Sequence, residues 1–239
     1  MTATARDHAS RFSATSESVV AGERMVCDVR GAIHFPEIGL LAVSDLHLEK
    51  GSRHARRGWL LPPYDTGATL EKLAGVIEDY RPKIVVSLGD SFDDVGGAAR
   101  MPDIYRTRLL ELMRGRDWIW VAGNHDPEKP ADLPGGTVSE LAVGPLVFRH
   151  EPSKGRLAGE IAGHLHPGAR IVQRGRSVRR RCFASDGARL IMPAFGAFTG
   201  ALNVLDRAFS DMFCPDNLVA YMMGDGRLYP MNRRLLHAD

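Results

Sequence analysis

Three short apolar runs in the first half of the chain have the pattern of buried β-strands. They cover residues 40–44, 84–88 and 118–122 and consist mainly of Leu, β-branched and aromatic residues. Runs of this length are short for a helix, and their lack of alternating polar positions indicates that both faces of each strand are covered. We therefore predict three strands in the interior of the fold.

Two segments between these runs have the spacing of amphipathic helices, with apolar residues three and four positions apart. In the first segment they are Leu70, Leu73, Ala74 and Ile77, and in the second Tyr105, Leu109, Leu112 and Met113. Asp65 or Thr66 is a candidate N-cap for the first helix, which ends before Pro82. Gly115 is a candidate C-cap for the second. The alternation of strand and helix indicates a layered α/β fold.

The second half of the chain is expected to add another sheet. Short apolar runs separated by Gly and Pro turns occupy residues 146–149, 159–162, 169–172 and 189–192. No segment there has a strong helical period, so we predict a mixed or antiparallel sheet packed on the first. The later apolar residues, among them Met222 and Met223, belong either to the core or to a dimer surface.

Composition sets the class of protein. Of 239 residues, 44% are hydrophobic and 25% charged, as in folded domains. Residues 1–21, rich in Ser, Thr and Ala, are expected to be a flexible leader, and residues 22–239 one domain. A formal net charge of +2 excludes a histone-like protein but allows a local basic patch. Because the cysteines form no CxxC pair and no long apolar stretch is present, we expect a reduced, cytoplasmic protein without a membrane segment.

Polar clusters follow the predicted strands at their carboxyl ends, where open α/β sheets bind ligands. The clusters are Asp45-Leu46-His47, Gly89-Asp90, Gly123-Asn124-His125-Asp126, His150 and Gly163-His164-Leu165-His166. Five of the nine histidines fall in these clusters. Imidazole nitrogen and carboxylate oxygen bind manganese, iron or zinc, and the lack of a cysteine argues against a structural zinc site. The pattern predicts a metal site.

Each cluster also has an ordinary structural explanation when it is taken alone. Asp-x-His and Gly-Asp commonly make turns or caps, and Gly-Asn-His-Asp can form an Asn turn. The two histidines at 164 and 166 fit a solvated loop, and His150 alone fits a core histidine. The order of all five clusters and their placement directly after strands favour the metal site.

Together the clusters resemble the signature of the calcineurin-like metallophosphoesterases, over residues 40–195. The resemblance implies a single-domain, four-layer α/β/β/α sandwich with a two-metal site. It assigns Asp45, His47 and His166 to one metal and Asn124, His150 and His164 to the other, with Asp90 as the bridge. His150 departs slightly from the pattern, because it follows Arg149 where many members have Gly.

Longer strings resemble one bacterial subfamily, the ligase-associated DNA damage response endonucleases. These strings are residues 44–51, 89–94, 123–127 and 193–200. The subfamily consists of manganese-dependent nucleases grouped with an ATP-dependent DNA ligase and a helicase. The resemblance therefore implies a phosphodiesterase with two divalent metals, most readily Mn(II), that cleaves single-stranded DNA during DNA repair. Iron and zinc fit the same ligands, and a homodimer is compatible with the sequence.

In such a site the two metals clamp a phosphate and activate a bridging hydroxide, which attacks phosphorus. His125 stands next to the ligand Asn124 and is the candidate general acid that protonates the leaving oxygen, because histidine titrates near neutral pH. Asp126 either orients His125 or caps a turn. Asp93 and Asp94 either support a metal histidine or cap the next element.

Two groups of basic residues are candidate substrate contacts. Lys50, Arg53 and Arg57 closely follow the first cluster, and the Arg-rich run 174–181, which includes Arg179 and Arg181, has a hairpin-like pattern. Lys and Arg neutralise nucleic-acid phosphates, so both groups fit a path for a DNA backbone. A solvated loop and a solvated charged hairpin are the alternatives.

Two other functions are compatible with the same clusters. A phosphomonoesterase or a small-molecule pyrophosphatase, acting on nucleotides or lipid precursors, would use the same dinuclear site. A scaffold that had lost its metals would keep the fold, although the full ligand set argues against it. An open basic groove would favour the nuclease, and a closed pocket would favour the small-molecule enzyme.

Overall fold

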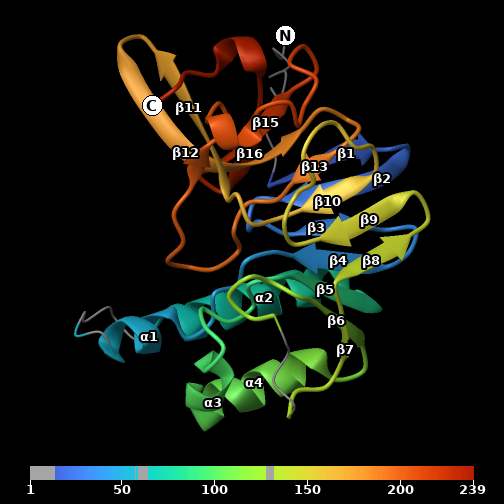
Figure 1. The fold of residues 1–239 in the computed structure, drawn as a ribbon, viewed down its shortest axis with the longest axis vertical. Helices are drawn as coiled ribbons and strands as arrows, with labels where there is room; N and C mark the ends of the chain where they lie inside the picture. The colour runs from blue at the N-terminus through green and yellow to red at the C-terminus, as the bar shows by residue number, and fades with distance from the viewer. Residues whose placement is uncertain (1–13, 57, 59–63, 128–131) are drawn as a thin grey trace, which may run out of the picture.

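The computed structural model describes residues 14–56, 58, 64–127 and 132–239, and its first sheet has seven strands in chain order (Figure 1). The strands are β1 (Thr15–Val20), β2 (Glu23–Asp28), β3 (Ile33–Phe35), β4 (Leu40–Val43), β5 (Ile84–Leu88), β6 (Asp117–Val121) and β7 (Gly136–Val138). Strands β1 to β4 pair antiparallel, and β4 to β7 pair parallel. The three predicted interior strands are confirmed as β4, β5 and β6.

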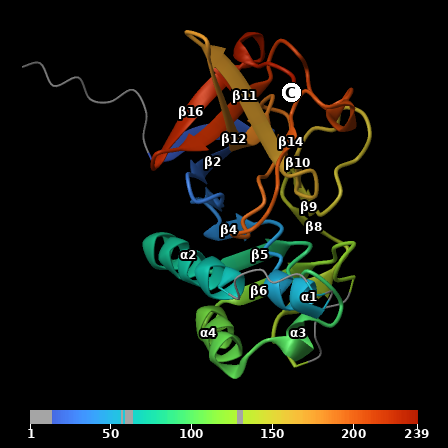
Figure 2. The same ribbon diagram turned by 90° about the vertical axis from the view of Figure 1, so that its left-hand side faces the viewer.

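Helices lie on one side of this sheet (Figure 2). They are α1 (Lys50–Arg56), α2 (Asp65–Tyr80), α3 (Gly97–Arg100) and α4 (Asp103–Met113). The two predicted helices are confirmed as α2 and α4, whereas α1 and α3 were not expected. None of the helices in the described part of the chain is both long enough and apolar enough to cross a bilayer.

The start of α2 differs from the predicted cap. The carboxylate of Asp65 accepts a hydrogen bond from the main-chain N–H of Gly51 at 3.0 Å, and the hydroxyl of Thr66 accepts one from the N–H of Glu49 at 2.8 Å. These side chains therefore join α2 to the start of α1 instead of capping their own helix.

The second sheet is mixed, as predicted. Its main path runs in the order β14, β11, β12, β13, β10, β9 and β8, and β15 and β16 branch from β12. The strands are β8 (Glu140–Val143), β9 (Leu146–Arg149), β10 (Glu160–Ala162), β11 (Pro167–Gln173), β12 (Arg176–Ser185), β13 (Leu190–Ile191), β14 (Leu202–Asn203), β15 (Val219–Gly224) and β16 (Arg227–Asn232). Strands β9, β10 and β13 pair parallel, and β11 and β12 form the predicted arginine-rich hairpin.

Three apolar cores separate four layers, which confirms the predicted sandwich. In β4, Leu41 faces the core under the helices, while Leu40 faces the core between the sheets. The third core covers the outer face of the second sheet. Its outer layer consists of loops and two short 3-10 helices, η1 (Arg207–Phe209) and η2 (Arg233–Leu235). Met222 lies in this third core and Met223 packs against the second, so both are core residues.

The N-terminal segment differs from the predicted leader. Residues Thr15–Val20 form β1 and pair with β2 along their whole length. Exposed and part-buried positions alternate along β1, and only Val20 is fully covered. This edge strand is too polar to stand out in a hydrophobicity pattern. Residues 1–13 lie outside the described residues.

Candidate metal centre

Loops from both sheets bring the predicted ligands together. In the first sheet, the carboxyl ends of β4, β5 and β6 lead into Asp45 and His47, Asp90, and Asn124. In the second, β9 leads into His150, and β10 into His164 and His166. Because the strands within each set are parallel, their carboxyl ends lie at one edge of the sheet. The two edges meet at the site.

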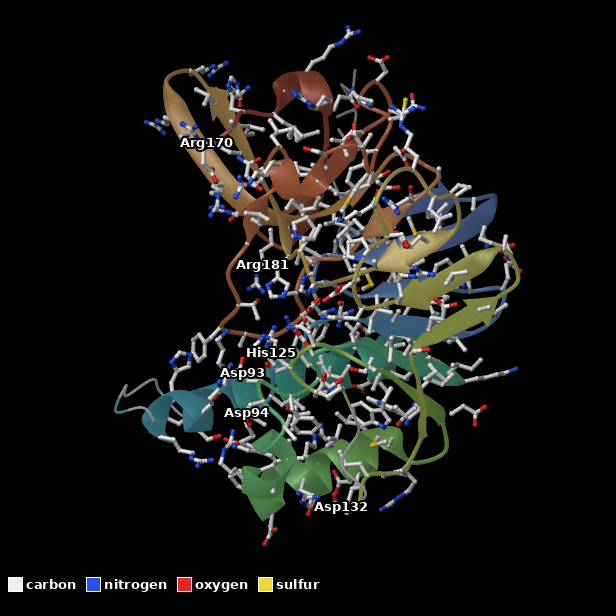
Figure 3. All side chains as sticks on the ribbon, in the orientation of Figure 1. Asp93, Asp94, His125, Asp132, Arg170 and Arg181 are labelled. Carbon is white, nitrogen blue, oxygen red and sulfur yellow. The ribbon has the colours of Figure 1, made fainter. Side chains whose placement is uncertain are left out.

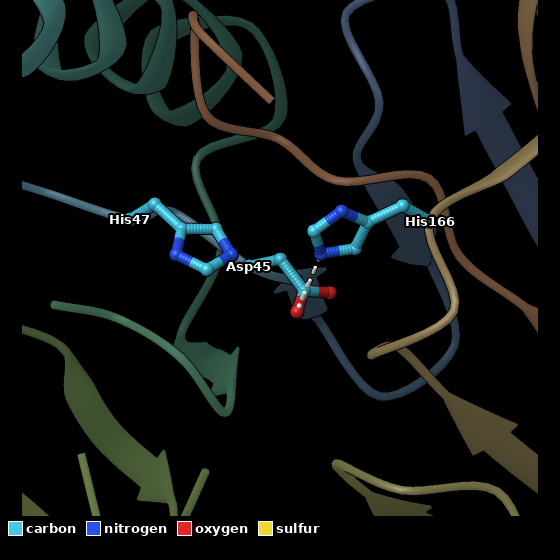
Figure 4. Close-up of side chains that lie close together, drawn as sticks. All are labelled: Asp45, His47 and His166. Atoms are coloured by element: carbon cyan, nitrogen blue, oxygen red, sulfur yellow. Dashed lines mark ion pairs between the residues drawn. The ribbon is translucent and has the colours of Figure 1, made fainter. Parts of the chain in front are cut away.

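Asp45, His47 and His166 form the first group (Figure 4), with one potential ligand atom of each within 4.8 Å of the others. Nε2 of His166 lies 3.1 Å from Oδ1 of Asp45. The other carboxylate oxygen, Oδ2, accepts hydrogen bonds from the hydroxyl of Ser44 and from the main-chain N–H of His164, the latter at 3.1 Å. Oδ1 of Asp45 is therefore the oxygen left to bind a cation.

Asp90, His150 and His164 form the second group, and Asn124 joins them. Nε2 of His150 lies 2.9 Å from Oδ1 of Asn124, 3.2 Å from Nδ1 of His164 and 3.4 Å from Oδ2 of Asp90. Nδ1 of His150 lies 3.2 Å from the carbonyl oxygen of Leu88, which can only accept a hydrogen bond. The proton of a neutral His150 is therefore on Nδ1, and Nε2 presents its lone pair to the other ligand atoms.

These atoms suit divalent cations. Oδ1 of Asp45 and Nε2 of His47 are buried and have no hydrogen-bond partner, which is costly unless something binds them. In the second group, when His150 is neutral, lone pairs of nitrogen and oxygen face one another at close range, an arrangement that a cation between them stabilises. Imidazole nitrogen with carboxylate and amide oxygen is a donor set for manganese, iron or zinc.

The charge at the second group also favours a cation. Burial alone would lower the pKa of His150, but the carboxylates of Asp90 and Asp45 raise it to about 9. Burial would likewise raise the pKa of Asp90, but its hydrogen bonds with His150 and with the main chain of His125 lower it to about 2. The two carboxylates therefore stabilise positive charge at this point, whether on an imidazolium or on a metal ion.

The backbone at the site adopts a conformation that side chains rarely occupy. Five of the seven candidate ligands have a positive φ, and these are Asp45 at 53°, His47 at 43°, Asp90 at 45°, His164 at 64° and His166 at 45°. The left-handed region costs a non-glycine residue about 1–2 kcal/mol. Such strain persists only where the surrounding structure requires it, and it clusters at functional sites.

Glycines allow the loops to approach one another closely. A Cβ on Gly89 would lie 2.3 Å from Nδ1 of His150, and a Cβ on Gly163 would lie 1.8 Å from Oγ of Ser44. Both distances are far below van der Waals contact. The glycines in the Gly-Asp and Gly-His-x-His clusters therefore make room for residues that arrive from another loop.

Asp93 connects the first group of ligands to the candidate general acid. Nδ1 of His47 lies 3.0 Å from its carboxylate, and Nδ1 of His125 donates to its carbonyl oxygen at 2.9 Å. Arg53 pairs with the same carboxylate at 2.8 Å. Burial would raise the pKa of Asp93, but the hydrogen bonds of its carboxylate with His47 and Arg53 and the charge of Lys50 hold it well below its usual range. The sequence left two roles open for Asp93, support of a metal histidine and capping of the next element. This geometry favours support of a candidate metal histidine.

His125 points its second ring nitrogen toward Asp90. Nε2 of His125 lies 4.0 Å from Oδ2 of Asp90, and the main-chain N–H of His125 donates to Oδ1 of Asp90 at 2.9 Å. The side chain is 33% exposed, so a substrate can reach it. Figure 3 shows His125 and Asp93 close together between the two sheets and the helices. Because Nδ1 is engaged with Asp93, Nε2 is the atom that can deliver a proton.

The neighbouring acidic residues stabilise loops. Oδ2 of Asp126 accepts a hydrogen bond from the main-chain N–H of Phe92 at 3.0 Å, which makes it a cap of that loop. Burial, with the nearby charge of Asp90, raises the pKa of Asp126 to about 7. Asp94 pairs with Arg100 at 2.8 Å.

The first group of basic candidates lies on α1 instead of in a loop. Lys50 begins this helix, with its ammonium 3.7 Å from the carboxylate of Asp93, and Arg53 makes the closer ion pair described above. Both side chains are about three-quarters covered, so their charge acts largely on Asp93. Arg57 lies outside the described residues.

Arg181 of β12 holds a loop in place. Its guanidinium donates to the carbonyl oxygens of Ala194 and Gly196, both at 3.0 Å, and to the hydroxyl of Thr199 at 3.1 Å. These acceptors all belong to the segment between β13 and β14. We call residues 193–200 of this segment the strap. Burial lowers the pKa of Arg181. Contrary to the sequence-based expectation of a substrate contact, the hydrogen bonds of Arg181 are directed to the strap.

Lys72 of α2 holds the same loop from the other side. Its ammonium donates to the carbonyl oxygen of Phe195 and lies 4.0 Å from the centre of that ring. Burial, and secondarily the charge of Arg181, lower the pKa of Lys72 to about 7. Sequence reasoning did not single out this lysine, because a lone cation on an amphipathic helix carries no distinctive signal.

Arg179 remains available to solvent. One of its nitrogens donates to the carbonyl oxygen of Ala201 at 2.7 Å and to the carboxylate of Asp239 at 3.1 Å. Its side chain is still 45% exposed. Arg179 therefore lies at the end of the strap with part of its guanidinium free to contact an anion.

Comparisons with known proteins identify the family. The family model of the calcineurin-like phosphoesterases matches residues 38–181, more than half of the chain. Among solved structures, the Pseudomonas putida nuclease MPE is similar with a TM-score of 0.68 and 26% identity, covering 91% of this chain and 100% of that chain. Yfce, a phosphoesterase from E. coli, has a TM-score of 0.40 and 15% identity, covering 80% of this chain and 97% of that chain.

A comparison with curated protein sequences finds no match. The range that the family model covers includes all seven candidate ligands and the general-acid candidate. The chain therefore belongs to the calcineurin-like phosphoesterases and is a metal-dependent phosphoesterase.

Proposed function

We propose that the protein is a two-metal phosphodiesterase that cleaves nucleic acid. Asp45, His47 and His166 hold one divalent cation, and Asn124, His150 and His164 hold the other, with Asp90 shared between them. The observation that carries this proposal is the convergence of ligand atoms from two sheets on two adjacent points, with the buried Nε2 of His47 left without a hydrogen-bond partner.

In the proposed mechanism, the bound cations supply positive charge for the phosphate and an activated water as nucleophile. Asp90 keeps Oδ2 for the cations, because its Oδ1 accepts the main-chain N–H of His125. Nε2 of His125 protonates the leaving oxygen, and the carbonyl of Asp93 fixes the orientation of the ring. The strained backbone at the ligands keeps their side chains directed at the same points.

The arginine-rich hairpin supports a polyanionic substrate. β11 begins at Pro167, the residue after His166, so the hairpin projects directly from the candidate metal centre. At about 3.3 Å per residue, its turn at Arg174 is roughly 25 Å further along. Arg174, Arg176 and Arg180 are exposed along it. Figure 3 shows Arg181 near the base and Arg170 well along the hairpin. This arrangement suits the backbone of a nucleic-acid strand.

The finer features of the proposal rest on resemblance. The similarity to the P. putida nuclease supports a nuclease. The resemblance of the sequence to the ligase-associated endonucleases supports single-stranded DNA as substrate, manganese as metal, and a role in DNA repair beside a DNA ligase and a helicase in the cytoplasm. The donor set is compatible with manganese and equally with iron or zinc.

The proposal is tested by hydrolysis of an aryl phosphodiester and of the matching monoester, with manganese and with a chelator, followed by cleavage of single-stranded DNA. We expect manganese-dependent diester cleavage, little monoesterase activity, and cutting of DNA. Replacing Arg176 and Arg180 by Ala should leave aryl diester hydrolysis intact and weaken the salt dependence of DNA binding. Dominant monoester cleavage would instead indicate a small-molecule phosphatase.

A further inference from the structure

The strap lies directly against the candidate metal centre. The main-chain N–H of Phe195 donates to the carbonyl oxygen of Ser44 at 2.7 Å, and that of Gly196 donates to the carbonyl oxygen of Asp45 at 3.0 Å. A Cβ on Gly196 would lie 2.4 Å from the carbonyl oxygen of Leu46, so the two segments are in the closest possible contact. The middle of the strap is therefore fixed to the backbone of a candidate ligand.

The strap is also held from its other sides. Arg181 binds the carbonyl oxygens on either side of Phe195, and Lys72 binds the carbonyl of Phe195 itself. The hydroxyl of Thr69 on α2 accepts the main-chain N–H of Ala197 at 3.1 Å. These contacts come from three parts of the fold, namely β12, α2 and the residues that follow β4, so the strap has little freedom to move.

An aromatic side chain is exposed on this rigid segment. Phe195 and Ala194 are buried, whereas Phe198 is 46% exposed. A single exposed apolar residue is ordinary on a protein surface. Here, however, the main chain is fixed two residues earlier, where the N–H of Gly196 donates to the carbonyl oxygen of Asp45. One residue after the ring, the side-chain hydroxyl of Thr199 accepts a hydrogen bond from Arg181. The main chain that carries the ring is therefore fixed within two residues of a contact with Asp45.

A cation contacts the same segment further along the chain. Ala201, three residues beyond Phe198, accepts a hydrogen bond from the half-exposed Arg179. Figures 1 and 2 both show the segment between β13 and β14 running from the base of the arginine hairpin down to the level of β4 and α2. Along the chain, Phe198 thus lies between Gly196, which contacts Asp45, and Ala201, whose carbonyl oxygen accepts a hydrogen bond from a cation that can contact phosphate.

We propose that Phe198 is a stacking platform for one unpaired nucleobase beside the phosphodiester that is cut, with Arg179 contacting the backbone of the same strand. The proposal rests on the nuclease function proposed above and specifies its substrate. Aromatic rings stack on any base without sequence preference, and a neighbouring cation holds the phosphate. A base inside a duplex has both faces covered, so the platform selects single strands.

The test is cleavage by the manganese-loaded enzyme of two single strands of equal length, one of thymidines and one of stable abasic tetrahydrofuran residues. We expect Phe198→Ala to lower kcat/KM on the thymidine strand by about tenfold and to leave the abasic strand unchanged. Phe198→Trp should retain activity on both, while Phe198→Leu, which keeps apolar bulk without a π face, should behave as the Ala variant.

Ile104→Ala is the matched control, because Ile104 is 74% exposed at the start of α4 and should affect neither strand. Thermal unfolding of each variant checks that the strap stays folded. Equal losses on both strands, or no loss on thymidines, would overturn the stacking platform while leaving the nuclease in place. Failure of the unaltered protein to cut either strand would overturn the proposed function itself.

Discussion

The ring of His125 is anchored to the main chain of Asp93, with Nδ1 of the imidazole 2.9 Å from the carbonyl oxygen. A carbonyl oxygen only accepts hydrogen bonds, so Nδ1 carries the proton in the neutral ring. Nε2 then takes up a second proton when the ring is charged and can donate it to a substrate. The carboxylate of Asp93 meanwhile contacts His47. One residue thus orients both the general-acid candidate and a candidate metal ligand.

Replacement of His125 by Ala should lower turnover and preserve metal binding. Loss of a general acid typically costs roughly 100- to 10,000-fold. The loss should be greatest for an alkyl leaving group and smaller for a nitrophenyl leaving group, which departs without protonation. Metal content and hydrolysis of the two diesters are the measurements. Loss of a metal ion in His125→Ala would show that His125 is a ligand.

Asp93→Asn should weaken metal binding. An amide cannot hold Nδ1 of His47 as a carboxylate does, and such supporting residues typically affect metal affinity or activity by about 10- to 100-fold. The adjacent Asp94→Asn is the matched control, because Asp94 pairs with Arg100 in a partly exposed ion pair. Manganese titration of both variants decides the point. Equal manganese affinities in the two variants would mean that Asp93 contributes to folding and does not support a metal ligand.

Arg181→Ala should reduce stability and activity together. The buried carbonyl oxygen of Ala194 would lose its Arg181 donor, at a cost of about 1–3 kcal/mol if it is left unsatisfied, whereas that of Gly196 keeps the hydroxyl of Thr199. Activity should fall even on a small aryl diester, because the strap supports Asp45. Arg180→Ala, one residue away on the exposed side, should retain small-diester hydrolysis. A normal small-diester rate in Arg181→Ala would show that the strap does not support the centre.

The stability contributed by Lys72 should depend on pH. Its pKa is lowered from 10.5 to about 7 in the folded protein, chiefly by burial. Between these values the unfolded chain holds a proton that the folded chain lacks, so the free energy of unfolding should rise with pH relative to Lys72→Met. Below about pH 7 both states are protonated and the difference should be constant. Urea unfolding of both proteins across this range checks the slope, and parallel curves would contradict it.

The candidate ligands could be predicted from the sequence because each directly follows an apolar strand. The pattern of neighbouring residues is therefore enough to identify Asp45, Asp90 and His150 as candidates, because their tertiary contacts are not needed to recognise it. The roles of Asp93 and Arg181 depend on partners far away in the chain. Nothing in the Arg-rich run around Arg181 distinguishes a guanidinium that holds a loop from one that meets solvent. β1 escaped prediction because an edge strand with one polar face has little apolar signal.

Calorimetric titration of the metal-free protein with manganese, with diester hydrolysis measured at each addition, tests for a site with two metal ions. We expect two ions to bind per chain, with activity rising as the second site fills. Asp90→Asn should lower the affinity of both sites and abolish turnover, because the proposed site has Asp90 serve both ions. Binding of one ion with full activity, or activity that persists in chelator, would contradict the two-metal site.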